Sequence, residues 1–517
     1  MAIIEPASAD YSDLSRRKAA VLLSSIVVVA LCGIVYELII GTVSSYLLGN
    51  SVYQFSLTIG FFMFAMGVGS YASRFVEGNL IQAFIHVELV LALIGGLCSI
   101  SLFLLFPAAP WLYMTGKFFF ICSIGFLVGL EIPILTRVLS DTSGARDSLS
   151  SVLSLDYIGA LAGSVLFPIL LLPSLGLIAS SFAIGLVNAA VAMVNVIFLR
   201  DHLDRPGRTL TTVVGVTAAL FALTLGAGRL TGWAQDHLYF DQVVWKEQTP
   251  YQSLVVTTSW QKNDTRLFID GHLQFSEADE YRYHEALVHP VMTHGDRAPA
   301  TVLILGGGDG LAVREVLKHP SVTRIDLVDL DPAMTDLGAG FGPIVRLNGD
   351  ALADPRVTVT NADAFSFVRD ADVAYDRVII DFPDPHNEAL SKLYSVEFYT
   401  MVRAAMAADG ALVTQSTSPF FARRTYWTVG HTLDQTFDHR TSYQISIPSF
   451  GVWGFHLAAA AGGRAGDWPD GLRFIDDATF EAAQRFPADI GDPGGAVPNT
   501  IFAPTIYRTY ARDMAQG

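Results

Sequence analysis

The first 230 residues consist mainly of long apolar stretches separated by short polar junctions. A helix that crosses a bilayer needs about 20 mostly apolar residues. Stretches of that length occupy seven places, at 19–41, 54–76, 80–106, 112–136, 152–173, 176–199 and 209–228. The first is too long, and begins too far from the N-terminus, for a plain signal peptide. The pattern therefore predicts a transmembrane helical domain over 1–230 with about seven spans.

After residue 240 the apolar stretches become shorter. Residues 251–258 and 265–269 alternate or run apolar and contain β-branched side chains, and Asp270-Gly271 between 269 and the next apolar position marks a tight turn. We therefore expect a small antiparallel unit, a β-hairpin cap, over 240–290.

Short apolar strands alternate with helical segments from 291 to 517. The predicted strands are 301–305, 324–328, 357–360 and 377–380, with helices near 311–318, 390–408 and 422–436 and closing strands at 443–447 and 453–459. Alternation of this kind forms a parallel sheet with crossover helices, so we expect a Rossmann-like α/β domain over 291–517. The Gly-, Pro- and Asp-rich segment 462–500 is predicted to be a surface excursion.

Composition divides the chain at the same place. Hydrophobic residues make up 51% and charged residues 16%, with a mean hydropathy of +0.41. This composition excludes a disordered chain and argues against a wholly soluble one. Residues 1–230 carry 11 Lys and Arg against 12 Asp and Glu, whereas the rest carry 22 against 37. An acidic domain repels nucleic-acid phosphates and suits cationic partners, so we expect no nucleic acid as a partner. The three cysteines lie in the apolar half and indicate neither a disulfide framework nor a metal site.

Basic residues mark alternate junctions of the apolar half, at Arg16-Arg17-Lys18, Arg74, Arg137 with Arg146, and Arg200 with Arg205 and Arg208. Cytoplasmic loops are rich in Lys and Arg, so the N-terminus is predicted to be cytoplasmic. With seven spans the acidic half would then lie outside the cell. A re-entrant span, or a bend within 19–49, would place it in the cytoplasm instead.

Ionisable residues occur inside the apolar stretches, at Glu37, Glu88, Lys117, Glu131 and Asp156. Charge is costly in hydrocarbon, which makes each one a candidate functional residue. Two interpretations stay open. The first is structural, with a Glu–Lys pair or protonated carboxyls packing the bundle. The second is a carboxylate-lined path for an organic cation.

A glycine-rich turn, Gly306–Gly310, directly follows the strand 301–305. Glycines let a backbone turn sharply and approach a ligand at the carboxyl end of a strand. Asp329 ends the next strand, where an acid can accept hydrogen bonds from ribose hydroxyls. Asp309, inside the turn, would repel a pyrophosphate and attract a cationic ligand. We therefore expect a sulfonium nucleoside here; the alternative is a tight turn whose acid caps a helix.

Two more acidic motifs follow predicted strands. Asp363 comes after 357–360, where it could accept from an adenine amino group or cap a helix. Asp381 and Asp384 lie three residues apart on a proline-containing loop after 377–380. Two such acids can bind a di-cation and leave one as a proton acceptor, or they can be solvated turn residues.

The segment Asp279–Glu285, preceded by Gln274, is dense in polar and aromatic groups. By itself it could be any exposed helix start. The sequence contains no metal-binding spacing such as His-x-x-x-His and no compelling Ser/His/Asp order, so no metal is expected.

Together these residues resemble the spermidine synthases, the polyamine aminopropyltransferases, from about Gln252 to about Phe455. The motifs that carry the resemblance are Tyr251-Gln252, Asp270-Gly271 with Gln274, Asp279-Glu280 with Tyr283-His284-Glu285, Gly306–Gly310 with Arg314-Glu315 and Lys318-His319, Asp329-Leu330-Asp331, Asp381–Pro385, Leu393-Tyr394 with Phe398-Tyr399, and Ile447-Pro448. The apolar spans and Lys392–Ser395 look like the membrane-anchored bacterial branch.

The resemblance implies a fold of the S-adenosylmethionine-dependent transferase type and an enzyme that needs no prosthetic group. Such enzymes transfer an aminopropyl group from decarboxylated S-adenosylmethionine to an amine, typically putrescine, and release spermidine and methylthioadenosine. The implied donor-binding residues are Gln252, His284, Asp309, Asp329, Asp363 and Ala364. The implied acceptor-binding residues are Asp381, Asp384, Gln274 and Tyr283, with Asp381 as the catalytic acid/base. A homodimer and a multi-pass cell-membrane protein with a cytoplasmic catalytic domain are also expected.

Departures from the family pattern lie near the glycine turn or the acceptor, at Leu311, Phe382-Pro383, Glu388 and Phe450. They leave the acceptor amine open. Two other functions are alternatives: a polyamine transporter or sensor with a nucleoside-binding domain, suggested by Glu37, Glu131 and Asp156, and a methyltransferase on the same fold.

Overall fold

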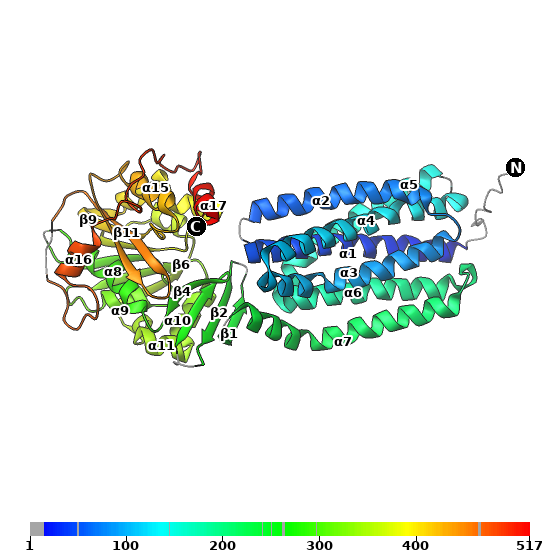
Figure 1. The fold of residues 1–517 in the computed structure, drawn as a ribbon, viewed down its shortest axis with the longest axis horizontal. Coiled ribbons are helices and arrows are strands. Elements are labelled where there is room, and N and C mark those ends of the chain that lie inside the picture. The colour runs from blue at the N-terminus through cyan, green and yellow to red at the C-terminus, as the bar shows by residue number, and fades with distance from the viewer. Residues whose placement is uncertain are drawn as a thin grey trace. The chain divides into compact units, whose positions relative to one another are not determined.

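The computed structural model describes residues 15–48, 51–143, 145–239, 241–249, 251–260, 264–295, 297–463 and 467–516. The chain divides into two compact units, Met1–Phe240 and Asp241–Gly517 (Figure 1). The first unit is helical and the second is an α/β domain.

Among its described residues, the first unit contains seven long helices: α1 (Arg16–Leu48), α2 (Ser51–Ala72), α3 (Leu80–Ala108), α4 (Pro110–Ser143), α5 (Ala145–Leu166), α6 (Leu172–Phe198) and α7 (Pro206–Leu238). They run side by side, with α1 against α5 and α6, and α3 against α4, α6 and α7 (Figure 1). Small residues allow the close approach. A Cβ at Gly159 on α5 would collide with the Val27 carbonyl of α1, and one at Gly163 would lie 2.7 Å from the Leu31 carbonyl.

Six helical stretches among the described residues are long and apolar enough to cross a membrane, and one of them, Arg146–Phe198, has 53 residues. That stretch is not one straight helix. Gly176 has φ 72° and ψ −179°, and the Ser180 hydroxyl donates to the Leu171 carbonyl at 3.1 Å. Residues nine apart in a straight helix are about 13 Å apart. The chain therefore turns back here, and α5 and α6 correspond to two of the seven predicted spans.

The polar junctions of the helical unit meet at one end. Lys18 forms an ion pair with Asp201 at 3.2 Å, and the Arg137 guanidinium donates to the Ser73 and Val76 carbonyls at 3.0 and 3.1 Å. Helix α7 ends at the opposite end of the unit (Figure 1). Basic residues therefore gather at the end of the unit where α7 begins.

The buried acids of the helical unit do not pair with its buried lysine. Lys117 donates to Gln54 at 2.6 Å. Both carboxyl oxygens of Glu88 and one of Glu131 are buried without a hydrogen-bond partner among the described residues. The expectation of a Glu–Lys pair is therefore wrong for Lys117.

The α/β unit begins with an antiparallel sheet of four strands in sequential order, β1 (Gln242–Gln248), β2 (Ser253–Thr258), β3 (Thr265–Ile269) and β4 (His272–Ser276). The predicted tight turn joins β3 to β4, with Asp270 and Gly271 both at positive φ, 49° and 79°. Such a turn suits the twist of a hairpin and favours Asp-Gly. The structure extends the expected hairpin to four strands.

A seven-stranded sheet follows, in the order β10-β11-β9-β8-β5-β6-β7. Its strands are β5 (Thr301–Gly306), β6 (Arg324–Asp329), β7 (Val357–Asn361), β8 (Tyr375–Asp381), β9 (Met406–Gln415), β10 (His439–Ile447) and β11 (Gly451–Ala459). Strands β5 to β9 are parallel, which confirms the predicted parallel sheet, and β10 and β11 are antiparallel. The helices are α8 (Glu280–Met292), α9 (Leu311–Val316), α10 (Pro332–Gly340), α11 (Gly342–Asn348), α12 (Ala364–Arg369), α13 (Glu388–Ser391), α14 (Val396–Ala404), α15 (Arg423–Leu433), α16 (Asp477–Ala483) and α17 (Ile506–Gln516).

Two predictions in this unit were wrong. The segment expected to be helical at 390–408 is helical only as far as Ala404, and the strand β9 that follows, between β11 and β8, was not predicted. Its apolar run Ala411–Val413 is fully buried, and periodicity does not distinguish a short buried strand from a helix. The segment 462–500 is not wholly on the surface, because Ile475, Ile490 and Asn499 are buried.

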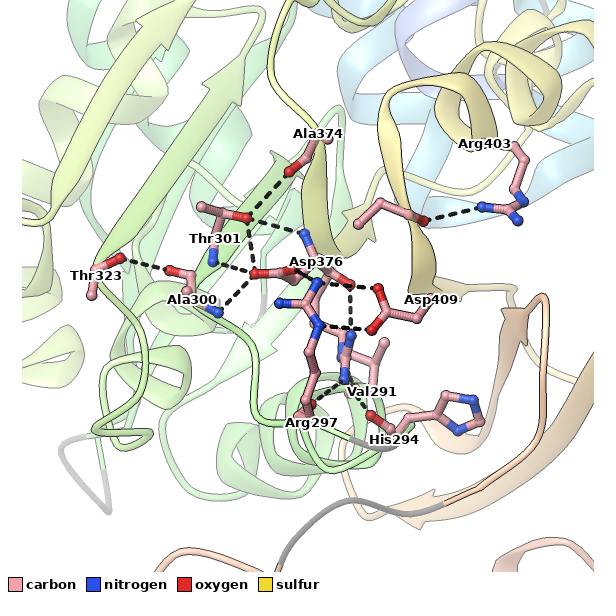
Figure 2. A network of polar contacts seen from close by, with 12 residues as sticks. Val291, His294, Arg297, Ala300, Thr301, Thr323, Ala374, Asp376, Arg403 and Asp409 are labelled. Carbon is pink, nitrogen blue, oxygen red and sulfur yellow. Dashed lines mark hydrogen bonds and ion pairs between the residues drawn. The ribbon is translucent and has the colours of Figure 1, made fainter.

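A polar network fixes the amino ends of β5 and β8, at the sheet edge away from the strand carboxyl ends (Figure 2). One carboxylate oxygen of Asp376 accepts the Ala300 and Thr301 N–H groups at 2.8 and 2.9 Å. Its other oxygen binds Arg297 at 2.6 Å, and Arg297 also binds Asp409. These bonds join the loop before β5 to β8 and β9.

Arg377 lies beside this network and is only 1% exposed. Its guanidinium donates to the carbonyls of Val291, Asp376, His294 and Arg297. Buried carbonyls need a donor, so one side chain satisfies four backbone acceptors.

Replacing Arg377 by methionine is expected to destabilise the α/β unit by about 3 kcal/mol, because buried carbonyls lose their donor. The thermal transition of the unit, followed by near-UV circular dichroism, should fall by roughly 10 °C. Arg369→Met is the matched control, since Arg369 pairs with Asp370 on the surface and exposed pairs contribute little. An equal shift in both variants would contradict a structural role for Arg377.

Candidate active site

A cavity of about 490 Å³ lies at the carboxyl ends of the parallel strands, where open α/β sheets bind ligands. Its lining includes every residue that was expected to bind the donor or the acceptor: Gln252, Gln274, Tyr283, His284, Asp309, Asp329, Asp363, Ala364, Asp381 and Asp384. The sheet and helix α8 thus bring residues up to 132 positions apart in sequence into one site.

Four acids of the cavity follow four adjacent strands. Asp363 follows β7, Asp329 ends β6, Asp309 follows β5, and Asp381 ends β8. Neighbouring strands lie about 4.8 Å apart, so strand order spreads these carboxylates along one edge of the sheet. A ligand there meets a row of negative charge.

The turn after β5 contains glycines, which let neighbouring groups approach its backbone closely. Gly306 has φ 81°, and a Cβ there would collide with the Asp381 carbonyl. The Gly308 N–H donates to Asp329 Oδ2 at 3.0 Å, and a Cβ on Gly308 would lie 2.7 Å from that oxygen. Position 306 therefore requires glycine, and a side chain at position 308 would displace the Asp329 carboxylate.

Asp329 is oriented by the backbone. Its two oxygens accept the N–H groups of Gly308 and Asp331, each at 3.0 Å. Burial raises the pKa of Asp329 to about 6, although these two bonds oppose the rise. Each carboxylate oxygen accepts two hydrogen bonds, so acceptor capacity remains for ribose hydroxyls.

Asp309 is buried in the turn and faces the same cavity. Its Oδ1 accepts the Leu311 N–H at 2.9 Å. Burial raises the pKa of Asp309 to about 6; the charge of His284 lowers it, and that of Asp381 raises it further. A bound cation would favour its ionised form.

Helix α8 presents Glu280, Tyr283 and His284 on one face, as residues three and four apart do. Glu280 accepts from His284 Nδ1 at 2.8 Å and pairs with both terminal nitrogens of Arg314 at 2.9 and 2.8 Å. Burial lowers the pKa of His284, but Glu280, Asp309 and other nearby acids outweigh burial and the pKa is raised. A raised pKa increases the protonated fraction of His284, which therefore adds positive charge beside the acids.

Asp381 receives a 2.5 Å hydrogen bond from the Tyr283 hydroxyl. Burial raises the pKa of Asp381, while His284 and the Tyr283 bond lower it. The short bond fixes one carboxylate oxygen. A carboxylate held in this way, with a raised pKa, is suited to accept a proton.

Asp384 accepts the hydroxyls of Thr417 and Tyr510 through Oδ2, each at 3.0 Å. Its Oδ1 is buried without a partner among the described residues. Burial raises the pKa of Asp384, and the two hydroxyls lower it.

Asp363 caps a helix, as one of its two sequence interpretations expected, and it also makes an ion pair that was not predicted. It caps α12 through the Phe365 N–H at 3.4 Å, and it pairs with Lys392 at 3.1 Å. Asp363 and Ala364 also line the cavity, so a role toward the ligand stays a prediction.

Several lining residues escaped the sequence analysis. Gln415 and Thr417 end or follow β9, which was not predicted, and Trp453 lies on β11. Tyr510 and Met514 come from α17. The spacing of Ile506, Tyr510 and Met514, each four residues apart, is the signal that could have indicated an inward helix face.

Known proteins are similar to this chain in sequence. A sequence model described as "Spermine/spermidine synthase domain" matches residues 280–463. Polyamine aminopropyltransferase 1 of Streptomyces coelicolor is 44% identical over 99% of this chain and 98% of its own length. The polyamine aminopropyltransferase of Leptospira interrogans is 43% identical over 90% of this chain and 93% of its own, and polyamine aminopropyltransferase 2 of Ralstonia nicotianae is 43% identical over 96% and 98%. This chain belongs to the polyamine aminopropyltransferase family.

Proposed function

We propose that this enzyme transfers the aminopropyl group of decarboxylated S-adenosylmethionine to a diamine, with putrescine and spermidine as acceptor and product. The observation that carries this proposal is the set of buried acids Asp309, Asp381 and Asp384, which line one cavity. No ion pair among the described side chains joins them to Lys or Arg. Unpaired buried acids favour cationic ligands, and both substrates are cations.

The donor occupies the β5–β7 side of the cavity. Asp329 accepts the ribose hydroxyls, and Asp363 and Ala364 border the adenine. Asp309, with Gln252 and His284 nearby, holds the aminopropyl arm. Ordinary S-adenosylmethionine carries an additional carboxylate, which these acids repel, so the site favours the decarboxylated donor.

The acceptor lies on the β8–β9 side, against Asp381, Asp384, Tyr283 and Gln274. An alkyl amine has a pKa near ~10 and arrives protonated. Asp381 takes one proton from the ammonium, and the freed nitrogen attacks the methylene next to sulfur. The C–N bond forms as the C–S bond breaks, and the electron pair leaves on sulfur as a neutral thioether. Alignment of the two cations supplies much of the acceleration.

This proposal is tested with purified enzyme, either form of the sulfonium donor and a panel of amines. We expect amine-dependent release of methylthioadenosine from the decarboxylated donor alone. Release of S-adenosylhomocysteine from the ordinary donor would indicate a methyltransferase. No release from either donor, together with amine uptake into vesicles that Glu37→Gln abolishes, would indicate a transporter.

We further propose that α1–α7 anchor the enzyme in the cell membrane as a multi-pass unit, with the catalytic unit in the cytoplasm. Both substrates are cations that do not cross a bilayer unaided. With seven passes, this arrangement puts the N-terminus and the basic junctions outside the cell, which is the opposite of the cytoplasmic N-terminus that the basic residues alone predict. Protease accessibility of the C-terminal half in intact cells and in inverted vesicles tests this: cleavage in intact cells would put the catalytic unit outside.

A further inference from the structure

Helix α17 forms a wall of the cavity that no motif of the sequence analysis included. Ile506, Tyr510 and Met514 share one face of the helix. Ile506 is fully buried in the core, Tyr510 is 9% exposed and Met514 is 49% exposed. Tyr510 and Met514 line the cavity, so the face runs from the core to the cavity rim.

The helix is fixed at both of its ends. Asn499, itself fully buried, accepts the N–H groups of Thr505 and Ile506 through its side-chain oxygen, at 3.0 and 3.3 Å. Near the other end, Asp513 accepts the N–H and the hydroxyl of Thr425, both at 2.9 Å. Tyr510 is therefore held between two anchors that do not line the cavity.

Tyr510 binds the acid on the acceptor side of the cavity. Its hydroxyl and that of Thr417 hold Asp384 Oδ2, while Oδ1 is buried without a hydrogen-bond partner among the described residues. Thr417 adopts φ 64°, which is unfavourable for a β-branched residue and typical of functional sites. Thr417 follows β9, which lies on the far side of β8 from β5, β6 and β7. The contact between Tyr510 and Asp384 therefore lies away from the acids that are proposed to bind the donor.

We propose that α17 selects the acceptor amine: Tyr510 positions Asp384 so that Oδ1 binds an ammonium, and Met514 limits how far the rest of the amine can extend. The inference rests on the proposed aminopropyl transfer. It assigns an acceptor-specific role to a helix that lies outside the matched family domain, which ends at residue 463.

Tyr510→Phe tests the positioning role. The KM for the amine is expected to rise about tenfold, the size of one hydrogen bond to a charged group, while kcat and donor affinity change less than twofold. The acid limb of kcat/KM for the amine should move to higher pH, because the Tyr510 bond lowers the pKa of Asp384. In an Asp384→Asn background, Tyr510→Phe should add nothing further.

Tyr507→Phe is the matched control, since this hydroxyl on the same helix binds only the neighbouring Arg508 among the described residues. Tyr507→Phe should leave the KM for the amine, kcat and the donor affinity unchanged. An equal loss of kcat and donor affinity in Tyr510→Phe, or full additivity with Asp384→Asn, would overturn the positioning role.

Met514→Ala and Met514→Trp test the length limit with diamines of three to six carbons and with spermidine. The ratio of kcat/KM for long over short amines should rise about tenfold in the first variant and fall in the second, since one methylene changes binding by that amount. Arg512→Ala, a truncation of an exposed side chain on α17, should leave the ratio unchanged. Unchanged ratios in both Met514 variants would refute the length limit, whereas a wild type inactive on every amine would refute aminopropyl transfer itself.

Discussion

Asp381→Asn is expected to lower kcat about a thousandfold and to leave the dissociation constant of decarboxylated S-adenosylmethionine within about threefold. The amide has nearly the same shape and still accepts the Tyr283 hydroxyl, which donates to Asp381 at 2.5 Å. It cannot take a proton from an ammonium, so the amine stays non-nucleophilic. Single-turnover release of methylthioadenosine gives the chemical step, and calorimetric titration gives the donor affinity.

The pH profile provides a second measurement for Asp381. Residual activity in Asp381→Asn should rise with pH up to the pKa of the free amine, because solvent must then remove the proton. Asp372→Asn is the control, since Asp372 is exposed and precedes the same strand. Unchanged turnover in Asp381→Asn would remove Asp381 from the chemistry, and a loss confined to donor affinity would make it a donor-binding residue.

The acids of the site could be predicted because each one follows a recognisable apolar strand. Asp329 and Asp381 are the last residues of β6 and β8. Carboxyl ends of parallel strands meet at one sheet edge, so strand prediction alone places these acids together. The glycine turn adds Asp309 for the same reason. The pattern of apolar strands in the sequence is therefore enough to predict which acids meet in the site.

The partners of these acids could not be predicted, because they depend on packing between distant segments. Tyr510 reaches Asp384 from 126 residues away. Arg314 contacts His284 through Glu280, and these residues belong to two motifs that are separate in the sequence. Lys117 binds Gln54 across two helices. Hydrophobic periodicity records which face is buried and carries no information on which side chain lies opposite.

The donor should bind about a hundredfold more weakly at pH 5 than at pH 7.5. Asp309 and Asp329 both have a pKa near 6, raised by burial, so each is about nine-tenths protonated at pH 5. A neutral carboxyl does not attract the sulfonium or the aminopropyl ammonium. The raised pKa values also mean that the empty folded protein takes up protons between about pH 6 and 4 that the unfolded chain does not, so these two groups favour the folded state there as pH falls. Weaker binding at pH 5 would therefore not arise from these two groups unfolding the protein.

Methylthioadenosine separates the two acids, because it keeps the ribose and lacks both positive charges. Its affinity should fall only about tenfold over the same range, through Asp329. Asp309→Asn should weaken binding of the charged donor at pH 7.5. In this variant the affinities of the donor and of methylthioadenosine should change with pH to the same extent. Titration calorimetry of both ligands from pH 5 to 8 measures this directly. Equal slopes for the two ligands in the wild type would show that Asp309 does not recognise the cation, and flat slopes for both would show that neither acid contacts the donor.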